Sequence, residues 1–417
     1  MKKSILITLL MIVTFSFIGC MGNSKEVSNE EIPNKKELTE KEKLEDFEYM
    51  YTILKENYPY FEVNKRQNGV DWLSKKNEYM DRIKASIDDE SFFKTLQIIM
   101  SELNNGHTHI LDEKFYSFAI DVYNKNSNYC EAWLKQLNNP KSIKRYEAAE
   151  EQKDKSPGTP NSPSSHIVSD NIKASILEKD KTAYLSIGAL NSFYIEEDMK
   201  IIKPFLQDVK DYKALIIDIR GNVGGDTRYW SDNIVPMLID RPLDYSNYIA
   251  YRGGSFVEDF VKCISGLDYD DLQPISNIKE ENLKKLPPEV IESFKYYIKE
   301  TNTLKPNNPI GFNGKIYLLI DGSVFSSSEA FAVFAKSTGF ATLVGERTGG
   351  DGIGSDPSIC TLPNSGYCFR FTKEMGMTAD GACNFEHKTE PDIKVSAKKA
   401  PDFNDDEAIQ AVLKLVH

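Results

Sequence analysis

The residue best placed for nucleophilic chemistry is Ser326, where a strand is expected to end and a helix to begin. Residues 315–320 form a short apolar run typical of a buried strand, and residues 329–336 have the pattern of a helix start. Backbone N–H groups at a helix start have no intrahelical acceptor, so they could stabilise an oxyanion made when a serine hydroxyl attacks a carbonyl. Alternatively, Ser326 only caps the helix, because Ser-Ser-Ser-Glu from this position also fits a capping box.

A candidate base follows another expected helix, in the run Leu-Asn-Asn-Gly-His-Thr-His over residues 103–109. The chain has five histidines, and this window holds His107 and His109. Imidazole is the natural general base near neutral pH. The alternative is a surface histidine favoured by the dipole at a helix C-terminus.

A third loop, Asp-Ile-Arg-Gly-Asn-Val-Gly-Gly-Asp over residues 218–226, joins an expected strand to an expected helix. Glycines here let the backbone turn sharply and bring N–H groups close to a ligand. A phosphate loop is disfavoured, since neither Gly-Lys-Ser/Thr nor Gly-x-Gly-x-x-Gly is present. An oxyanion hole fits better, and a simple tight turn is the alternative.

Together these loops resemble the C-terminal-processing (tail-specific) serine peptidases, and most of all the branch that includes the tricorn core. The resemblance rests on Asp-Ile-Arg-Gly-Asn-x-Gly-Gly, Ser-x-Ser-Glu, Gly-Glu-Arg-Thr-Gly-Gly, Leu-Pro-Asn-Ser-Gly and Glu-Pro-Asp, in this order. It covers the helical segment from about residue 39 and the segment 182–395. No PDZ-like module is evident. The sequence therefore gives no support for docking of substrate tails by such a module.

The resemblance assigns roles to individual residues. It implies Ser326 as nucleophile, His107 as base and Glu386 as the acid that orients the imidazole. Its implied oxyanion donors are the backbone N–H groups of Gly224 or Gly225 and of Ser327.

Two departures from the family pattern concern the catalytic acid and base. Members with a Ser–Lys dyad place lysine where this chain has Asp351, so the dyad fails here. The tricorn core has a serine before its histidine, whereas Gly106 occupies that place. Thr108 is a possible orienting substitute, unless Glu386 acts more directly.

The function implied is that of an exported serine peptidase, which hydrolyses peptides or proteins through an acyl-enzyme without a cofactor or metal. The first alternative is a non-catalytic ligand- or peptide-binding protein on the same scaffold. The second is an acyl-ester hydrolase.

The N-terminus has the features of an export signal. Lys2 and Lys3 precede an apolar run over residues 5–18, which ends in Gly19-Cys20. A small residue directly before cysteine resembles a bacterial lipobox, with lipidation at Cys20. We therefore expect a lipid anchor on the outer face of a bacterial cell membrane.

Cysteine spacing argues against a structural zinc site, because no Cys-x-x-Cys pair or Cys/His cluster occurs. Cys360 and Cys368 flank the turn signal Leu-Pro-Asn-Ser-Gly between two strand-like runs. If the hairpin is centred on Asn364, the two cysteines face each other. Export would then make a Cys360–Cys368 disulfide plausible.

The elements that must position these loops predict an α/β fold. Apolar runs at 184–187, 214–219, 315–320 and 341–344 are separated by helical patterns. The resemblance implies a spiral ββα (ClpP/crotonase-like) core preceded by a small helical domain. The expected segments are a signal peptide (1–19), a flexible tether (20–38), a helical domain (39–110), a helical and linker insertion (111–180), the core (181–400, with a helical insertion at 256–307) and a C-terminal helix (401–417).

Bulk composition excludes one partner class. The 417 residues carry a net charge of −12, and no basic stripe offsets repulsion from phosphates. We therefore expect no nucleic-acid partner.

Overall fold

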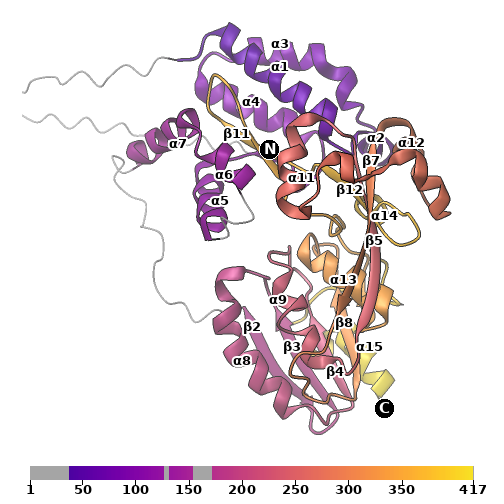
Figure 1. Cartoon of the computed structure of the whole chain (residues 1–417). Helices are drawn as coiled ribbons and strands as arrows, with labels where there is room; N and C mark the ends of the chain where they lie inside the picture. The colour runs from indigo at the N-terminus through magenta and orange to yellow at the C-terminus, as the bar shows by residue number, and fades with distance from the viewer. Residues whose placement is uncertain (1–36, 126–130, 154–170, 417) are drawn as a thin grey trace, which may run out of the picture. The chain divides into compact units, whose positions relative to one another are not determined.

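The computed structural model describes residues 37–125, 131–153 and 171–416 (Figure 1). The described residues from 38 onward group into one compact unit. The expected signal peptide, most of the tether and Cys20 lie outside the described residues. Among the helices that are described, none combines the length and apolar character needed to cross a bilayer.

The chain starts with helices, as expected from its periodicity. Thr39 caps the first of them, because its hydroxyl accepts from Glu42 N–H at 3.2 Å and Glu42 returns a carboxylate to Thr39 N–H at 2.8 Å. The elements are α1 (Glu40–Asn57), α2 (Phe61–Asn68), η1 (Trp72–Lys75), α3 (Lys76–Lys84) and α4 (Asp89–Ser101).

These helices do not enclose a core of their own. Phe47, Trp72 and Leu96 belong to one apolar cluster that also contains Tyr248 and Met375 from a β-sheet far along the chain. The helical region is therefore packed onto the rest of the compact unit. Three further helices follow: α5 (Glu113–Lys125), α6 (Glu131–Leu137) and α7 (Pro140–Lys153).

The main sheet has six strands in the order β13-β9-β8-β4-β3-β2. All neighbours run parallel except β2 and β3. The strands are β2 (Ile172–Glu178), β3 (Thr182–Ile187), β4 (Ala214–Asp218), β8 (Lys315–Ile320), β9 (Thr342–Gly345) and β13 (Ile393–Lys394). The four apolar runs of the sequence are β3, β4, β8 and β9, which confirms the predicted α/β core.

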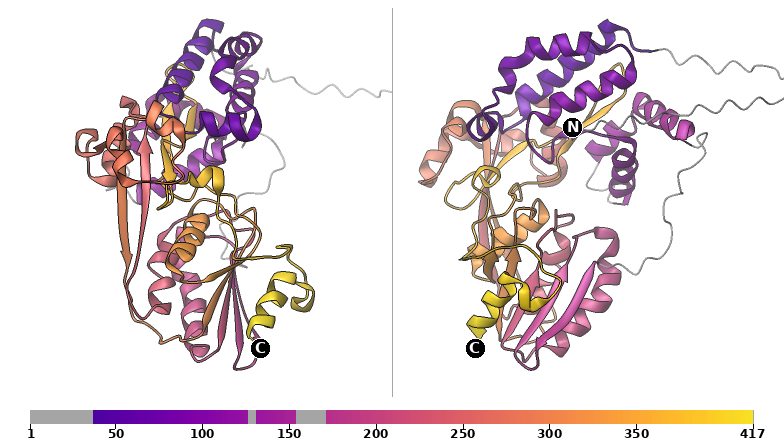
Figure 2. Two further views of the ribbon diagram at one scale, coloured as in Figure 1. Left: turned by 90° about the vertical axis from the view of Figure 1, so that its right-hand side faces the viewer. Right: turned by 180° about the vertical axis from the view of Figure 1, so that it is seen from behind.

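Alternation within a strand decides which helices cover each face of this sheet. Leu215 and Ile217 point into a cluster with α8 (Ile195–Asp208) and α13 (Ser327–Thr338). Ile216 points into the opposite cluster with α15 (Glu407–Val416). The views in Figure 2 show α15 on the side of the sheet away from α8.

The expected helical insertion at 256–307 is only partly helical. It contains η4 (Ser255–Val257), α11 (Glu258–Ser265), η5 (Tyr269–Asp271), η6 (Ile275–Glu281) and α12 (Pro288–Ser293), but also β6 (Gln273–Pro274) and β7 (Tyr296–Leu304). β7 pairs along its whole length with β5 (Leu243–Tyr251) in a sheet ordered β12-β5-β7-β6, where β12 is Glu374–Met377. Pairing with β5 thus outweighs the charged composition of this segment.

The third sheet corrects the predicted disulfide. β10 (Ser358–Thr361) and β11 (Cys368–Phe371) form the expected hairpin, and β1 (His109–Ile110) adds to β11. The register pairs Cys368 with Thr361 and Cys360 with Phe369. Because neighbouring positions point to opposite faces, the two thiols lie in different apolar clusters, and both are free. The predicted Cys360–Cys368 bond is wrong.

Candidate active site

Ser326 lies between β8 and α13 in a backbone conformation that only a constrained site retains. Its φ of 57° and ψ of −128° are unusual for a residue with a side chain. Its side chain makes no capping hydrogen bond, so the capping interpretation is wrong. The half-buried hydroxyl is therefore available at the N-terminus of a twelve-residue helix.

The neighbouring serines differ from Ser326 in burial or contacts, and Ser327 is buried with no partner for its hydroxyl among the described residues. Ser328 is buried and donates its hydroxyl to Asn222 Oδ1 at 2.6 Å, which ties the helix start to the glycine loop. Ser323 is exposed at the preceding turn. Among the serines of this run, the geometry singles out Ser326.

The glycine loop contacts Ser326 so closely that a side chain would not fit. A Cβ on Gly224 would lie 2.9 Å from both Ser326 Cβ and Ser327 N, at a φ of 103°. The N–H of Gly224 donates to Asn222 Oδ1 at 2.9 Å. In the described part of the chain, the N–H groups of Gly225 and Ser327 have no acceptor. These two are therefore the donors open to an oxyanion.

His107 reaches this loop from the end of α4. Its ring centroid lies 4.5 Å from that of Phe325, the residue before Ser326. Gly106 allows this close approach, because a Cβ would lie only 3.2 Å from the Phe325 ring, which would then have to shift slightly. The imidazole Nδ1 lies 2.8 Å from Asp351 Oδ2. With Nδ1 occupied, Nε2 is the nitrogen left for proton transfer.

Asp351 is the carboxylate that holds the base, and sequence reasoning did not find it. Tyr60 donates its hydroxyl to Oδ1 at 3.0 Å, and Asn105 donates its amide to Oδ2 at 2.9 Å. Burial acts to raise the pKa of Asp351, but the charge of His107 and these hydrogen bonds bring the pKa below its usual value. The sequence signal was a carboxylate at the position where the family resemblance places the lysine of a Ser–Lys dyad.

Glu386 does not contact the imidazole, which corrects its predicted role. It lies on α14 (Asn384–His387), and its two oxygens accept from Arg66 Nε at 2.8 Å and Nη2 at 2.7 Å. Arg66 also binds Glu289, with contacts of 3.0 and 2.6 Å. A guanidinium fork that pairs with both carboxylates keeps Glu386 in a network joining α2 and α14.

Thr108 supports the base only through a neighbour. Its hydroxyl donates to Asn105 Oδ1 at 3.0 Å, and the same oxygen accepts from His107 N–H at 2.9 Å. Thr108 therefore fixes Asn105, which in turn holds Asp351. The second histidine of the window, His109, is a poor base, because burial and the charge of Arg370 lower its pKa to about 4.

A buried acid links the nucleophile helix to the loop that carries Asp351. Glu329 Oε1 accepts from Asn384 Nδ2 and Thr389 Oγ1, both at 2.7 Å. Asn384 Oδ1 accepts from Gly352 N–H at 2.7 Å, one residue after Asp351. Burial raises the pKa of Glu329 to about 7, although these donors act to lower it.

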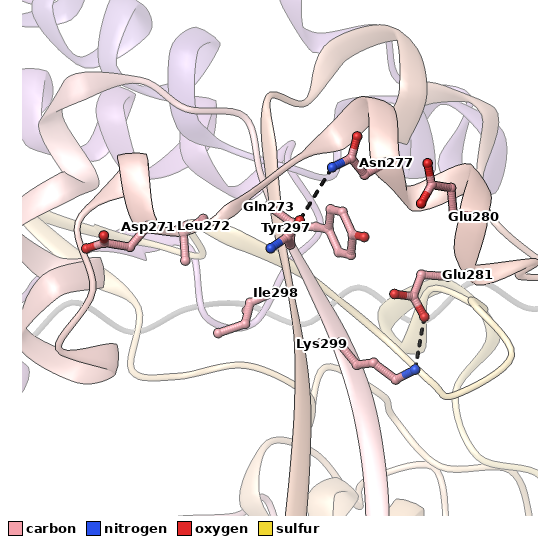
Figure 3. Close-up of a pocket in the computed structure, with 9 residues that line it drawn as sticks. All are labelled: Asp271, Leu272, Gln273, Asn277, Glu280, Glu281, Tyr297, Ile298 and Lys299. Carbon is pink, nitrogen blue, oxygen red and sulfur yellow. Dashed lines mark hydrogen bonds and ion pairs between the residues drawn. The ribbon is translucent and has the colours of Figure 1, made fainter.

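Two of the cavities in the described parts of the molecule differ in their relation to the site. One, of about 480 Å³, adjoins the base and is lined by residues on both sides of His107, including Asn105, Thr108 and His109. The other, of about 400 Å³, lies beside β7 and shares no residue with the site; Figure 3 shows Glu281 and Lys299 pairing in it at 2.9 Å. Within the described ranges, no group of three metal-ligating side chains occurs.

Known proteins share both this sequence pattern and this fold. The sequence profile of Peptidase family S41 matches residues 181–395. No curated protein sequence matched. A candidate peptidase from Parabacteroides merdae ATCC 43184 superposes with a TM-score of 0.55 at 18% identity, over 90% of this chain and 96% of that one. Mature CPAF in complex with lactacystin gives a TM-score of 0.55 at 16% identity, over 90% and 98%.

At these identities the structural likeness establishes the fold alone, a mixed α/β core with a helical N-terminal region. The family profile covers more than half of the chain. The chain belongs to peptidase family S41.

Proposed function

We propose that this protein is a serine peptidase that hydrolyses peptide bonds through an acyl-enzyme on Ser326. The observation that carries the proposal is the hydrogen bond between His107 and Asp351, with the same imidazole packed against Phe325. Asp351, His107 and Phe325, the residue before Ser326, are thus in contact although they come from three distant segments. Membership of family S41 supports the peptidase class.

In the proposed reaction, Nε2 of His107 takes the proton of the Ser326 hydroxyl as Oγ attacks the carbonyl carbon. Asp351 accepts the Nδ1 proton in a hydrogen bond, which fixes the tautomer and stabilises the imidazolium. The N–H groups of Gly225 and Ser327 stabilise the oxyanion. His107 then protonates the leaving amine, which leaves an acyl ester on Ser326. Water hydrolyses this ester, with His107 again acting first as base and then as acid.

A fluorophosphonate probe tests the nucleophile. We expect stoichiometric labelling of the wild-type protein, none of Ser326→Ala, and full labelling of the control Ser323→Ala, which alters an exposed serine of the same run. A folded wild-type protein that takes no label would contradict the proposal and favour a non-catalytic binding protein.

Turnover separates a peptidase from an esterase. A peptide library and a panel of small esters are offered to the wild-type protein, with Ser326→Ala as the blank. We expect peptide cleavage that Ser326→Ala abolishes. Hydrolysis of esters alone would replace the peptidase proposal with that of an acyl-ester hydrolase.

We also propose that the protein is exported and anchored by lipid at Cys20, on the strength of the charged start, the apolar run and Gly19-Cys20. Metabolic labelling with a fatty acid in a bacterial host should mark the wild type and the control Cys263→Ala, but not Cys20→Ala. Label that persists in Cys20→Ala would refute the anchor.

A further inference from the structure

Four aromatic residues, two exposed and two half-buried, lie on α5 and on η3 (Ser192–Tyr194). We call Phe115, Phe118, Phe193 and Tyr194 the aromatic surface. The Phe118 ring lies 5.9 Å from Phe115 and 6.3 Å from Phe193 between centroids, both edge-to-face. Phe118 is 47% exposed and Tyr194 44% exposed. Contiguous exposed aromatic side chains are uncommon on soluble proteins and mark binding sites.

This surface joins the two halves of the proposed site. At one end, Phe115 packs edge-to-face on His109 at 4.9 Å, two residues after the base. At the other end, η3 begins two residues after Leu190, which exchanges hydrogen bonds with the glycine loop. The Leu190 N–H donates to Gly224 O at 3.1 Å, and the Leu190 oxygen accepts from Asp226 N–H at 2.7 Å. A substrate at Ser326 can therefore extend onto the aromatic rings.

The charges beside the rings select the occupant. Lys125 Nζ lies 3.6 Å from the Phe193 centroid, and the Arg370 guanidinium lies 5.3 Å from that of Phe115. Both cations already occupy ring faces. Arg370 also pairs with Asp356 at 3.8 Å, so Lys125 is the cation that repels further positive charge. Apolar substrate side chains gain the most binding free energy from the remaining ring area. Their contact with the rings removes apolar surface of both the substrate and the protein from water.

We propose that the aromatic surface binds a large apolar side chain of the peptide substrate close to the scissile bond and disfavours lysine and arginine there. The proposal rests on the proposed peptidase function and specifies its substrate class. It makes Phe118 and Tyr194 residues that determine specificity, without a part in bond cleavage.

Binding tests the surface separately from catalysis. Ser326→Ala protein is titrated with three fluorescent peptides of one sequence that carry Phe, Ser or Lys at a scanned position. We expect the Phe peptide to bind at least about tenfold more tightly than the Ser peptide at one position. The Lys peptide should bind no more tightly than the Ser peptide.

Phe118→Ser combined with Tyr194→Ser should remove the preference for Phe and leave the Ser peptide unchanged. Ile98→Ser, at an exposed apolar position of α4, is the matched control and should keep the preference. With Ser326 intact, the double variant should raise KM for the Phe peptide and leave kcat unchanged.

Equal binding of the Phe and Ser peptides at every position, or a double variant with unchanged preference, overturns the surface proposal. Failure of the peptidase function would be seen in a different experiment. In that case the fluorophosphonate probe would not label Ser326, whichever peptides bind. If the Phe peptide still bound preferentially but Ser326 took no label, the binding-surface proposal would stand and the peptidase proposal would be rejected.

Discussion

Asp351 Oδ2 lies 2.8 Å from Nδ1 of His107, although 244 residues separate them in the chain. This contact supports the proposed role of Asp351, in the loop after β9, as the acid that orients His107. The assignment can be tested against its rival, Glu386.

Asp351→Asn should lower kcat by about 10³–10⁴-fold, because an amide stabilises the wrong tautomer and cannot stabilise the imidazolium. Glu386→Gln should change kcat little, since Glu386 binds Arg66 and has no contact with His107. Steady-state peptide hydrolysis measures both. A large loss in Glu386→Gln, with Asp351→Asn near wild type, would restore the original assignment.

Tyr60→Phe should shift the acid unfolding of the protein to higher pH. The folded-state pKa of Asp351 lies below its unfolded value, so its stabilising contribution is present above that unfolded value and is lost as pH falls through the folded pKa. Removing the Tyr60 hydroxyl brings the two pKa values closer and costs about 1.5–3 kcal/mol near neutral pH. Thermal midpoints from pH 3 to 7 measure the shift; parallel curves for variant and wild type would contradict it.

Glu329→Gln should flatten the dependence of stability on pH between about 4.5 and 7. Burial raises the folded pKa of Glu329 to about 7, so the protonated form is favoured in the fold. The stabilising contribution of Glu329 to the free energy of unfolding is complete below its unfolded pKa. It is lost as pH rises through its folded pKa. Glutamine imitates the protonated acid, and at pH 8 the variant should gain up to about 3 kcal/mol. Urea unfolding at pH 5 and pH 8 is the measurement, and an equal effect at both pH values would refute it.

Asp406→Ala should destabilise the fold by about 3–5 kcal/mol, because it leaves a buried guanidinium with an unpaired side. Arg220 is 1% exposed and binds Asp406 through contacts of 3.0 and 2.9 Å as well as Asp218. Asp406 also accepts from Ala408 N–H at 3.1 Å at the start of α15. The exposed Asp402→Ala is the control. Denaturant midpoints that match for the two variants would show that the buried pair adds little.

Reducing agent should leave the thermal midpoint unchanged, because Cys360 and Cys368 are free thiols on opposite faces of a hairpin. Alkylation in denaturant without reductant should modify both residues, as peptide mass spectrometry would show. A peptide pair linked by a Cys360–Cys368 bond in the untreated protein would reverse this correction.

The sequence by itself determined the local elements and the nucleophile loop. The run over residues 315–320 is β8 as expected, and the capping box of Thr39 and Glu42 starts α1. Such features depend on periodicity and neighbouring residues, which the sequence displays directly. The family resemblance then predicted catalytic roles for Ser326, His107 and the glycine loop.

Only the tertiary structure decided which carboxylate serves the base and which cysteines face each other. Asp351 and Glu386 are both acids near expected turns, and the choice depends on where Arg66 and Tyr60 lie after folding. The cysteines were misassigned because a one-residue change of register moves a side chain to the other face of a strand. Contacts between distant segments follow from packing, and the order of residues along the chain does not display them.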